Sequence, residues 1–269
     1  MSMPQAQDFL DESKALHALL QPLDDAAFGQ ATAFKGWTMN DVLRHLHYWN
    51  WMAWLQLNDE SLLVAQMDEI ARAGGMRPAE TAHVEGAAGR TLVDIWIDQA
   101  KATATAFAAA DPKARLKWAG PDMSARSSIT ARLMETWAHG QEIYDQLGVV
   151  RQNADRIRNI VVLGVNTFGW TFKNRKLDIP ETMPLVVLTA PSGEVWTYGE
   201  AGGTDRVEGP AEEFCQVVTQ TRNIADTALV VTGPIATQWM GFAQCFAGRP
   251  ETPPAPGVRK TQEILSDAN

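Results

Sequence analysis

The sequence predicts an α+β protein, in which a helical bundle is followed by a small domain of mixed helix and strand. Segments with helical periodicity dominate up to about residue 180, and short β-branched runs follow them. The chain has 269 residues, of which 45% are hydrophobic, so it can bury a sizeable core. We expect a helix bundle over residues 1–178, a small α+β domain over 179–250 and a polar, disordered tail over 251–269.

The first part of the chain carries the helical signals. Residues 5–20 place Phe9, Leu16 and Leu20 on one apolar stripe, which is typical of an amphipathic helix. The next helix is expected over 39–57, because Thr38 and Asp41 fit a capping box at its start. Further helices are expected at 61–73, 88–110, 124–147 and 153–172. Four long helices with shorter ones between them favour a bundle.

The second part carries the strand signals. Residues 184–189 and 195–198 flank a Pro-Ser-Gly turn and predict a β-hairpin. Two more short strands are expected at 205–209 and 229–232. The helices expected in this part cover 211–219 and 234–246.

Composition argues against several classes of function. The chain has 23 Lys and Arg against 32 Asp and Glu and a formal net charge of -9, which disfavours nucleic acid as a partner. Its first residues are polar and acidic, and no run approaches the roughly 20 apolar residues that span a membrane. Cys215 and Cys245 lack a CxxC partner, so we expect free thiols. These features predict a cytoplasmic protein with no membrane partner.

A histidine on the second long helix is the first candidate ligand. His45 shares a face with Val42, Trp49 and Met52, which is an apolar, inward-looking face. A core histidine bonded to a neighbour is the plainer interpretation. His47 lies about 160° around the same helix, so it cannot share a metal with His45. We expect His47 at the surface or at its boundary.

The helix over 124–147 supplies two more candidates. Glu135 and His139 are four residues apart and stack on one face, within a polar stripe from Ser128 to Gln146. A solvated face is the plainer interpretation of that stripe. Together with His45, however, the pair matches the way helix bundles build metal centres from facing helices. Two imidazoles and one carboxylate leave a coordination position open, which suits catalysis.

Two sequence stretches resemble motifs of the DinB-like, mycothiol-dependent maleylpyruvate isomerase superfamily. Residues 36–46, GWTMNDVLRHL, are similar to its GWT-x2-DV-x2-HL motif. Residues 132–142, RLMETWAHGQE, are similar to R-x-x-E-x-W-x-H-G-x-D/E, with Glu142 where relatives often carry Asp. Later stretches resemble a subfamily labelled as having a wyosine-base-formation domain, at 188–193, 195–199, 218–222 and 225–229. The resemblance covers about residues 5–248, and the acidic charge argues against the RNA role that the label suggests.

The resemblance implies a DinB-like four-helix domain that holds a divalent metal through His45, Glu135 and His139. Zinc is the metal expected, with nickel or iron as alternatives. It also implies a C-terminal α/β domain, similar to sterol-carrier folds, that covers the site. The cofactor implied is mycothiol or another low-molecular-weight thiol, whose pKa the metal lowers. Arg222 is the first candidate for holding a substrate carboxylate, and Arg206 is the second.

The function expected is that of a metal-dependent enzyme that uses a thiol for isomerisation or S-transfer on a small carboxylate-bearing substrate. Two alternatives stay open. One is a hydrolase or lyase that activates water at the same site, with Arg132 or Glu142 assisting proton transfer. The other is a non-enzymatic protein that binds a ligand in its second domain. The sequence leaves the substrate open, and it does not decide whether the chain forms a homodimer.

Overall fold

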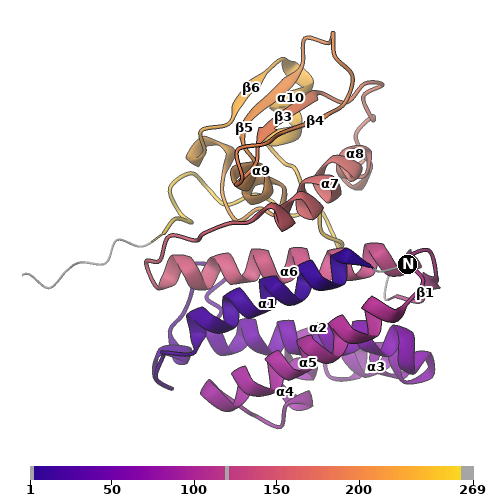
Figure 1. The fold of residues 1–269 in the computed structure, drawn as a ribbon, viewed down its shortest axis with the longest axis vertical. Coiled ribbons are helices and arrows are strands. Elements are labelled where there is room, and N and C mark those ends of the chain that lie inside the picture. The colour runs from indigo at the N-terminus through magenta and orange to yellow at the C-terminus, as the bar shows by residue number, and fades with distance from the viewer. Residues whose placement is uncertain (1–2, 119–120, 262–269) are drawn as a thin grey trace, which may run out of the picture. The chain divides into compact units, whose positions relative to one another are not determined.

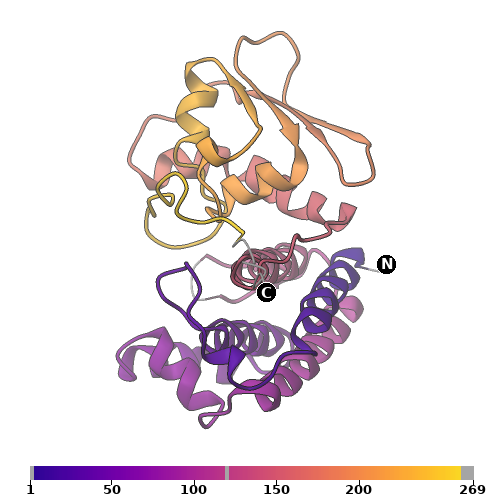
Figure 2. The same ribbon diagram turned by 90° about the vertical axis from the view of Figure 1, so that its left-hand side faces the viewer.

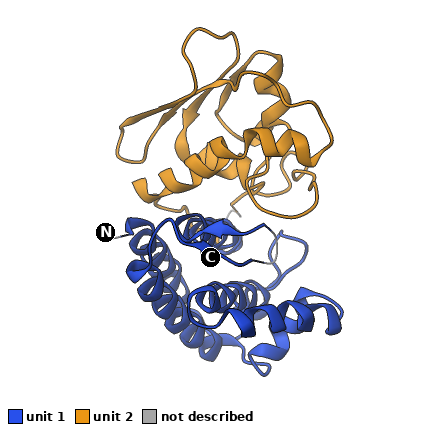
Figure 3. Ribbon diagram, turned by 90° about the vertical axis from the view of Figure 1, so that its right-hand side faces the viewer, with its two compact units in different colours: residues 1–146 blue, residues 147–269 orange. Residues whose placement is uncertain are grey.

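The structure is a computed structural model, and it describes residues 3–118 and 121–261. Helices fill the first part of the chain and a small sheet with helices fills the second (Figure 1). The mixed helix and sheet composition expected from the sequence is therefore confirmed. Two compact units divide the chain, Met1–Gln146 and Leu147–Asn269 (Figure 3).

The first unit is built on four long helices. Helix α1 contacts α5 and α6, and α2 also contacts α5 and α6 (Figure 1). Two shorter helices, α3 and α4, pack against α2. The helices are α1 (Pro4–Leu20), α2 (Met39–Asn58), α3 (Glu60–Arg72), α4 (Met76–His83), α5 (Gly89–Ala109) and α6 (Ala125–Gln146). A two-stranded ladder, β1 (Arg115–Leu116) with β2 (Met123–Ser124), precedes α6.

Local sequence explains where the site-bearing helix α2 begins. The Thr38 side chain accepts a hydrogen bond from the Asp41 N–H, and the Asp41 carboxylate accepts one from the Thr38 N–H. The capping box expected from the sequence is thus confirmed, and it satisfies two N–H groups that the helix leaves open. The neighbouring helix α5 begins at Gly89, whose φ of +57° favours glycine and whose N–H donates to Asn40 Oδ1.

The second unit contains a four-stranded sheet (Figure 2). Its strands follow the order β4-β3-β5-β6. Strands β3 and β4 form the expected antiparallel hairpin, β3 and β5 are parallel, and β5 and β6 are antiparallel. Helix α9 packs on β3 and β5, and α10 packs on β6. The strands are β3 (Leu185–Thr189), β4 (Val195–Tyr198), β5 (Arg206–Pro210) and β6 (Val230–Thr232). The helices are α7 (Arg158–Asn166), α8 (Phe168–Asn174), α9 (Ala211–Val218) and α10 (Pro234–Met240).

Two expected helices differ from the structure, and one helix was not expected. The continuous helix predicted over 153–172 is wrong, because it breaks at Thr167, whose hydroxyl donates to the carbonyls of Leu163 and Gly164. The helix predicted over 234–246 ends early, at Met240 before Gly241. Helix α4 has no counterpart in the sequence prediction, which left that stretch without an element.

The unit boundary falls earlier in the chain than the break expected at residue 178. Helices α7 and α8 pack against α9 and α10, so they belong with the sheet and not with the long helices. Part of the tail expected to be disordered is also packed in the second unit. Asn223 donates to the Pro254 carbonyl, and the buried Arg259 donates to the Gln220 carbonyl. The rest of that tail, residues 262–269, lies outside the described residues.

Large aromatic side chains fill the core of each unit. Trp96 and Trp137 are fully buried in the first unit. In the second, the Trp239 ring meets Phe168 and Phe214 edge-on at 5.1 and 5.8 Å between ring centroids. Among the described helices, none is both long enough and apolar enough to cross a membrane.

Candidate metal centre

Three side chains from two helices converge in the first unit. His45 comes from α2, and Glu135 and His139 come from successive turns of α6. One donor atom from each lies within 4.8 Å of the other two. The side chains of His45 and His139 are each 12% exposed and that of Glu135 is 25% exposed, so the cluster is sheltered but reachable. The structure thus brings together the three residues that the sequence proposed as ligands.

The spacing of these atoms suits a metal better than direct hydrogen bonds. His45 Nε2 lies 3.4 Å and His139 Nε2 3.3 Å from the same oxygen, Glu135 Oε2. Charge-assisted N–H···O bonds are usually about 2.7–2.9 Å long. Ligand atoms about 2.0–2.2 Å from a tetrahedral zinc ion lie about 3.3–3.6 Å apart. These two separations therefore match neighbouring ligands of a divalent ion, with two imidazoles and one carboxylate as donors.

A fourth residue, Glu80 of α4, contacts His45. Its Oε1 accepts hydrogen bonds from His45 Nδ1 at 2.9 Å and from Trp49 Nε1 at 3.0 Å. Its side chain is only 3% exposed. Glu80 was not predicted from the sequence, because a single glutamate in a stretch with no predicted helix gives no signal of where it faces.

Aromatic rings frame the two histidines. The Trp37 ring lies parallel to His139, at 5.5 Å between centroids, and meets His45 at an angle. Phe34 meets His139 edge-on at 5.2 Å. Arg77 lies over the Trp37 ring and forms an ion pair with Asp41. Trp37 and Asp41 belong to the same stretch as the capping box, so the start of α2 also forms one wall of the site.

Electrostatics favour an ionised carboxylate in the site. Burial alone would raise the pKa of Glu135, but contacts with His139 and His45 and the charge of Arg132 hold it well below its usual range. Burial would likewise lower the pKa of His45, but Glu135 and Glu80 outweigh it and raise that pKa. The site therefore attracts positive charge, whether a proton or a metal ion.

Two residues proposed for proton transfer lie on α6. Arg132 is 4% exposed, and its Nε and Nη2 atoms are buried with no hydrogen-bond partner among the described residues. Burial lowers its pKa, and the Glu135 carboxylate partly offsets that effect. Glu142 is also buried. The plainer interpretation of the α6 stripe as a solvated face is therefore wrong at Ser128, Arg132 and Glu142.

The candidates in the second unit lie on other elements. Arg222 is buried, and its Nη1 donates to the Thr221 carbonyl. Arg206 on β5 pairs with Glu208, which accepts from two of its nitrogens. Cys215 and Cys245 are buried and are not joined by a disulfide, as expected. Burial, and secondarily Cys245, raises the pKa of the Cys215 thiol well above its usual value.

His47, which the sequence placed at the surface or at its boundary, is only 9% exposed and is buried. Its ring lies 5.3 Å from that of His83, which stacks on Trp51. Helix α5 packs on α2, so the face opposite His45 is covered as well. A helix with neighbours on several sides has no free polar face, which periodicity alone does not reveal.

Buried His47 predicts a loss of stability in acid. Burial, and secondarily His83, lowers its pKa from 6.5 to about 4. Between these two pKa values His47 is protonated in the unfolded chain and neutral in the folded chain. The stability present above pH 6.5 is therefore lost as the pH falls. From pH 7 to pH 5 this loss amounts to about 2 kcal/mol. Urea unfolding at both pH values should show wild type losing about that much more than His47→Gln, and equal losses would contradict the assignment.

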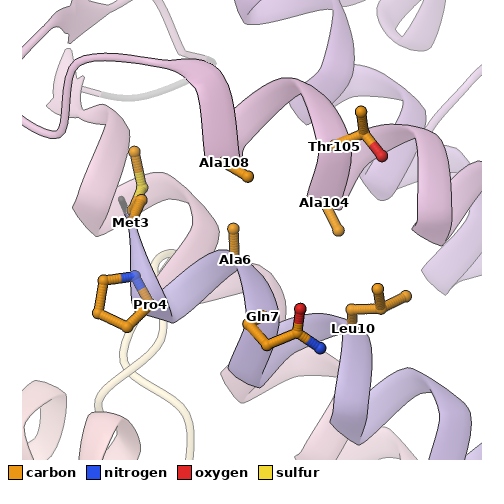
Figure 4. Close-up of a pocket in the computed structure, with 8 residues that line it drawn as sticks. All are labelled: Met3, Pro4, Ala6, Gln7, Leu10, Ala104, Thr105 and Ala108. Atoms are coloured by element: carbon orange, nitrogen blue, oxygen red, sulfur yellow. The ribbon is translucent and has the colours of Figure 1, made fainter. Parts of the chain in front are cut away.

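A separate hollow lies between the start of α1 and the end of α5 (Figure 4). Its volume is about 340 Å³, and none of the three candidate ligands lines it. The lining is mostly small and apolar: Met3, Pro4, Ala6, Gln7, Leu10, Ala104, Thr105 and Ala108. Such a surface offers few polar groups to orient a substrate, so it is not the candidate site.

Comparisons with known proteins agree with the motifs of the site-bearing unit. The family model for the mycothiol maleylpyruvate isomerase N-terminal domain matches residues 9–144. Two Mycobacterium tuberculosis relatives, "Uncharacterized protein MT0041" and "Uncharacterized protein Rv0036c", are each 36% identical over 249 residues, which are 92% of this chain and 96% of theirs. The crystal structure of the mycothiol-dependent maleylpyruvate isomerase is similar with a TM-score of 0.52 at 16% identity, over 80% of this chain and 87% of that chain. A histidine-to-alanine variant of that isomerase gives a TM-score of 0.51, and these likenesses show a shared fold.

Proposed function

Because the chain belongs to the mycothiol maleylpyruvate isomerase family, we propose that it is a metal-dependent enzyme that uses a low-molecular-weight thiol. The reaction proposed is isomerisation or S-transfer on a small carboxylate-bearing substrate. In this proposal the first unit is a DinB-like four-helix bundle that carries the metal, and the second is a sterol-carrier-like domain. Mycothiol is the thiol that the family name favours.

The observation that carries the proposal is the shared carboxylate oxygen. His45 Nε2 and His139 Nε2 lie 3.4 and 3.3 Å from Glu135 Oε2, the separation of neighbouring ligands around zinc. These three residues would hold the ion, with nickel and iron as alternatives to zinc. When bound, a divalent ion lowers the pKa of a coordinated thiol or water, so that a nucleophile forms near neutral pH.

The chain's own residues supply the surroundings for this chemistry. Glu135 stays ionised, and the buried Arg132 guanidinium places a positive charge beside it. Arg132 and Glu142 are our candidates for moving a proton, and Arg222 for binding a substrate carboxylate. The thiol has to come from a cofactor, because Cys215 is buried with a raised pKa and Cys245 is buried too.

Thermal unfolding of the zinc-loaded protein with added thiols tests the proposal. Mycothiol at one hundred times its Kd should stabilise the protein by about 2.7 kcal/mol, because it binds the folded state alone. S-methyl mycothiol is the matched control, since it cannot form a thiolate, and glutathione tests a second thiol. If zinc binds but no free thiol raises the melting temperature, thiol chemistry is contradicted and activation of water becomes the better account of the site.

A further inference from the structure

We propose that Glu80 is a positioning residue of the metal site, which holds His45 with Nδ1 protonated and Nε2 facing Glu135. The proposal rests on the proposed function, because it concerns the same site. Glu80 itself lies on the far side of the imidazole from the other two candidate ligands. It would therefore act through His45 and touch neither metal nor substrate.

The hydrogen bonds define the state of the ring. A carboxylate accepts and does not donate, so the 2.9 Å contact with Glu80 Oε1 requires a proton on His45 Nδ1. In the neutral imidazole the lone pair is then on Nε2, the atom that lies 3.4 Å from Glu135 Oε2. Metal-ligating histidines usually donate their second N–H to a carboxylate or carbonyl, which fixes the tautomer and raises the basicity of the ligand.

The Glu80 carboxylate is itself held in place. Trp49, one turn after His45 on α2, donates its indole N–H to the same oxygen at 3.0 Å. With the glutamate side chain only 3% exposed, water competes little for that oxygen. A carboxyl side chain that is buried and bonded to two α2 donors is costly to place in a core for packing alone. Its contact with the candidate ligand His45 supports the positioning role.

The backbone explains how Glu80 reaches α2. Helix α3 ends before Gly74 and Gly75, which have φ values of +81° and +135°. Glycine adopts such values without strain, so the chain can reverse there and return α4 to α2. Helices α3 and α4 both contact α2. Helix α4 thus places the Glu80 carboxylate next to His45 Nδ1.

A graded series of variants tests the role of Glu80. Glu80→Gln keeps an acceptor and loses the charge, whereas Glu80→Met loses both at similar length. Zinc affinity, measured by competition with a chromophoric chelator, should fall about 10–100-fold in Glu80→Met and less in Glu80→Gln. Glu85→Met, an exposed glutamate of the same region, is the control and should leave zinc affinity unchanged.

A second readout separates positioning from packing. Nitrogen-15 NMR of the zinc-free protein should show His45 protonated at Nδ1 in wild type and at Nε2 in part of the Glu80→Met molecules. Where Glu80→Met does not fold, Trp49→Phe removes the indole donor but keeps an aromatic ring, and it should cause a smaller loss of zinc affinity. Zinc affinity within threefold of wild type in Glu80→Met, with an unchanged tautomer, would overturn the role of Glu80. Failure of wild type to bind zinc would instead overturn the proposed function, while the tautomer would still test Glu80.

Discussion

Replacing His139 with alanine should lower zinc affinity by more than about a hundredfold and reduce thiol-dependent turnover to background. Loss of an outer-shell partner typically costs about 10–100-fold in metal affinity, so loss of a direct ligand costs more. The imidazole of His139 is one of two that share Glu135 Oε2, and no other His, Cys, Asp or Glu of the described residues completes the cluster. Equilibrium dialysis with metal analysis measures the change.

The matched control is His17→Ala on α1, which removes the same side chain outside the cluster. Its zinc stoichiometry and affinity should equal those of wild type. If His139→Ala and His17→Ala bind zinc equally well, the ion lies elsewhere. Circular dichroism of both variants shows whether each keeps its helices.

Trp137→Ala should destabilise the protein by about 3–5 kcal/mol, the usual cost of deleting a buried tryptophan. The ring is 0% exposed and lies on α6 between Glu135 and His139 in the sequence. Removing it leaves a cavity that the helices cannot fully close. Urea unfolding of the zinc-free protein measures the loss without a contribution from the metal.

Trp54→Ala is the comparison for that measurement. Trp54 lies on α2 and is only partly buried, so its loss removes less apolar surface from the core. The free energy of unfolding should therefore fall by less than in Trp137→Ala. Equal losses in the two variants would contradict the assignment of Trp137 to the core.

Local sequence patterns predicted where α2 begins and which residues share one face of α2 or of α6. Thr38 and Asp41 form a local capping box, and the faces that carry His45, Glu135 and His139 depend only on spacing within one helix. The resemblance to family motifs then linked the two helices. The spacing within a helix and the family motifs can both be read from short stretches of the chain.

The surroundings of the site could not be read in the same way. Glu80 contacts His45, which is 35 positions away in the sequence. It lies on the short helix α4, which the apolar pattern of the sequence did not predict. His47 is buried because other helices cover α2 on several sides, which depends on tertiary packing. The break at Thr167 depends on a side chain that competes with the helix for its carbonyls.

X-ray absorption at the zinc edge of the purified protein tests the central claim most directly. The account predicts one zinc per chain with nitrogen and oxygen neighbours at about 2.0–2.2 Å, and a new sulfur neighbour at about 2.3 Å when mycothiol is added. The nitrogen and oxygen shell should disappear with the metal in His139→Ala. A protein that binds no stoichiometric zinc, nickel or iron, or one whose metal signal survives in His139→Ala, would contradict the metal centre at His45, Glu135 and His139.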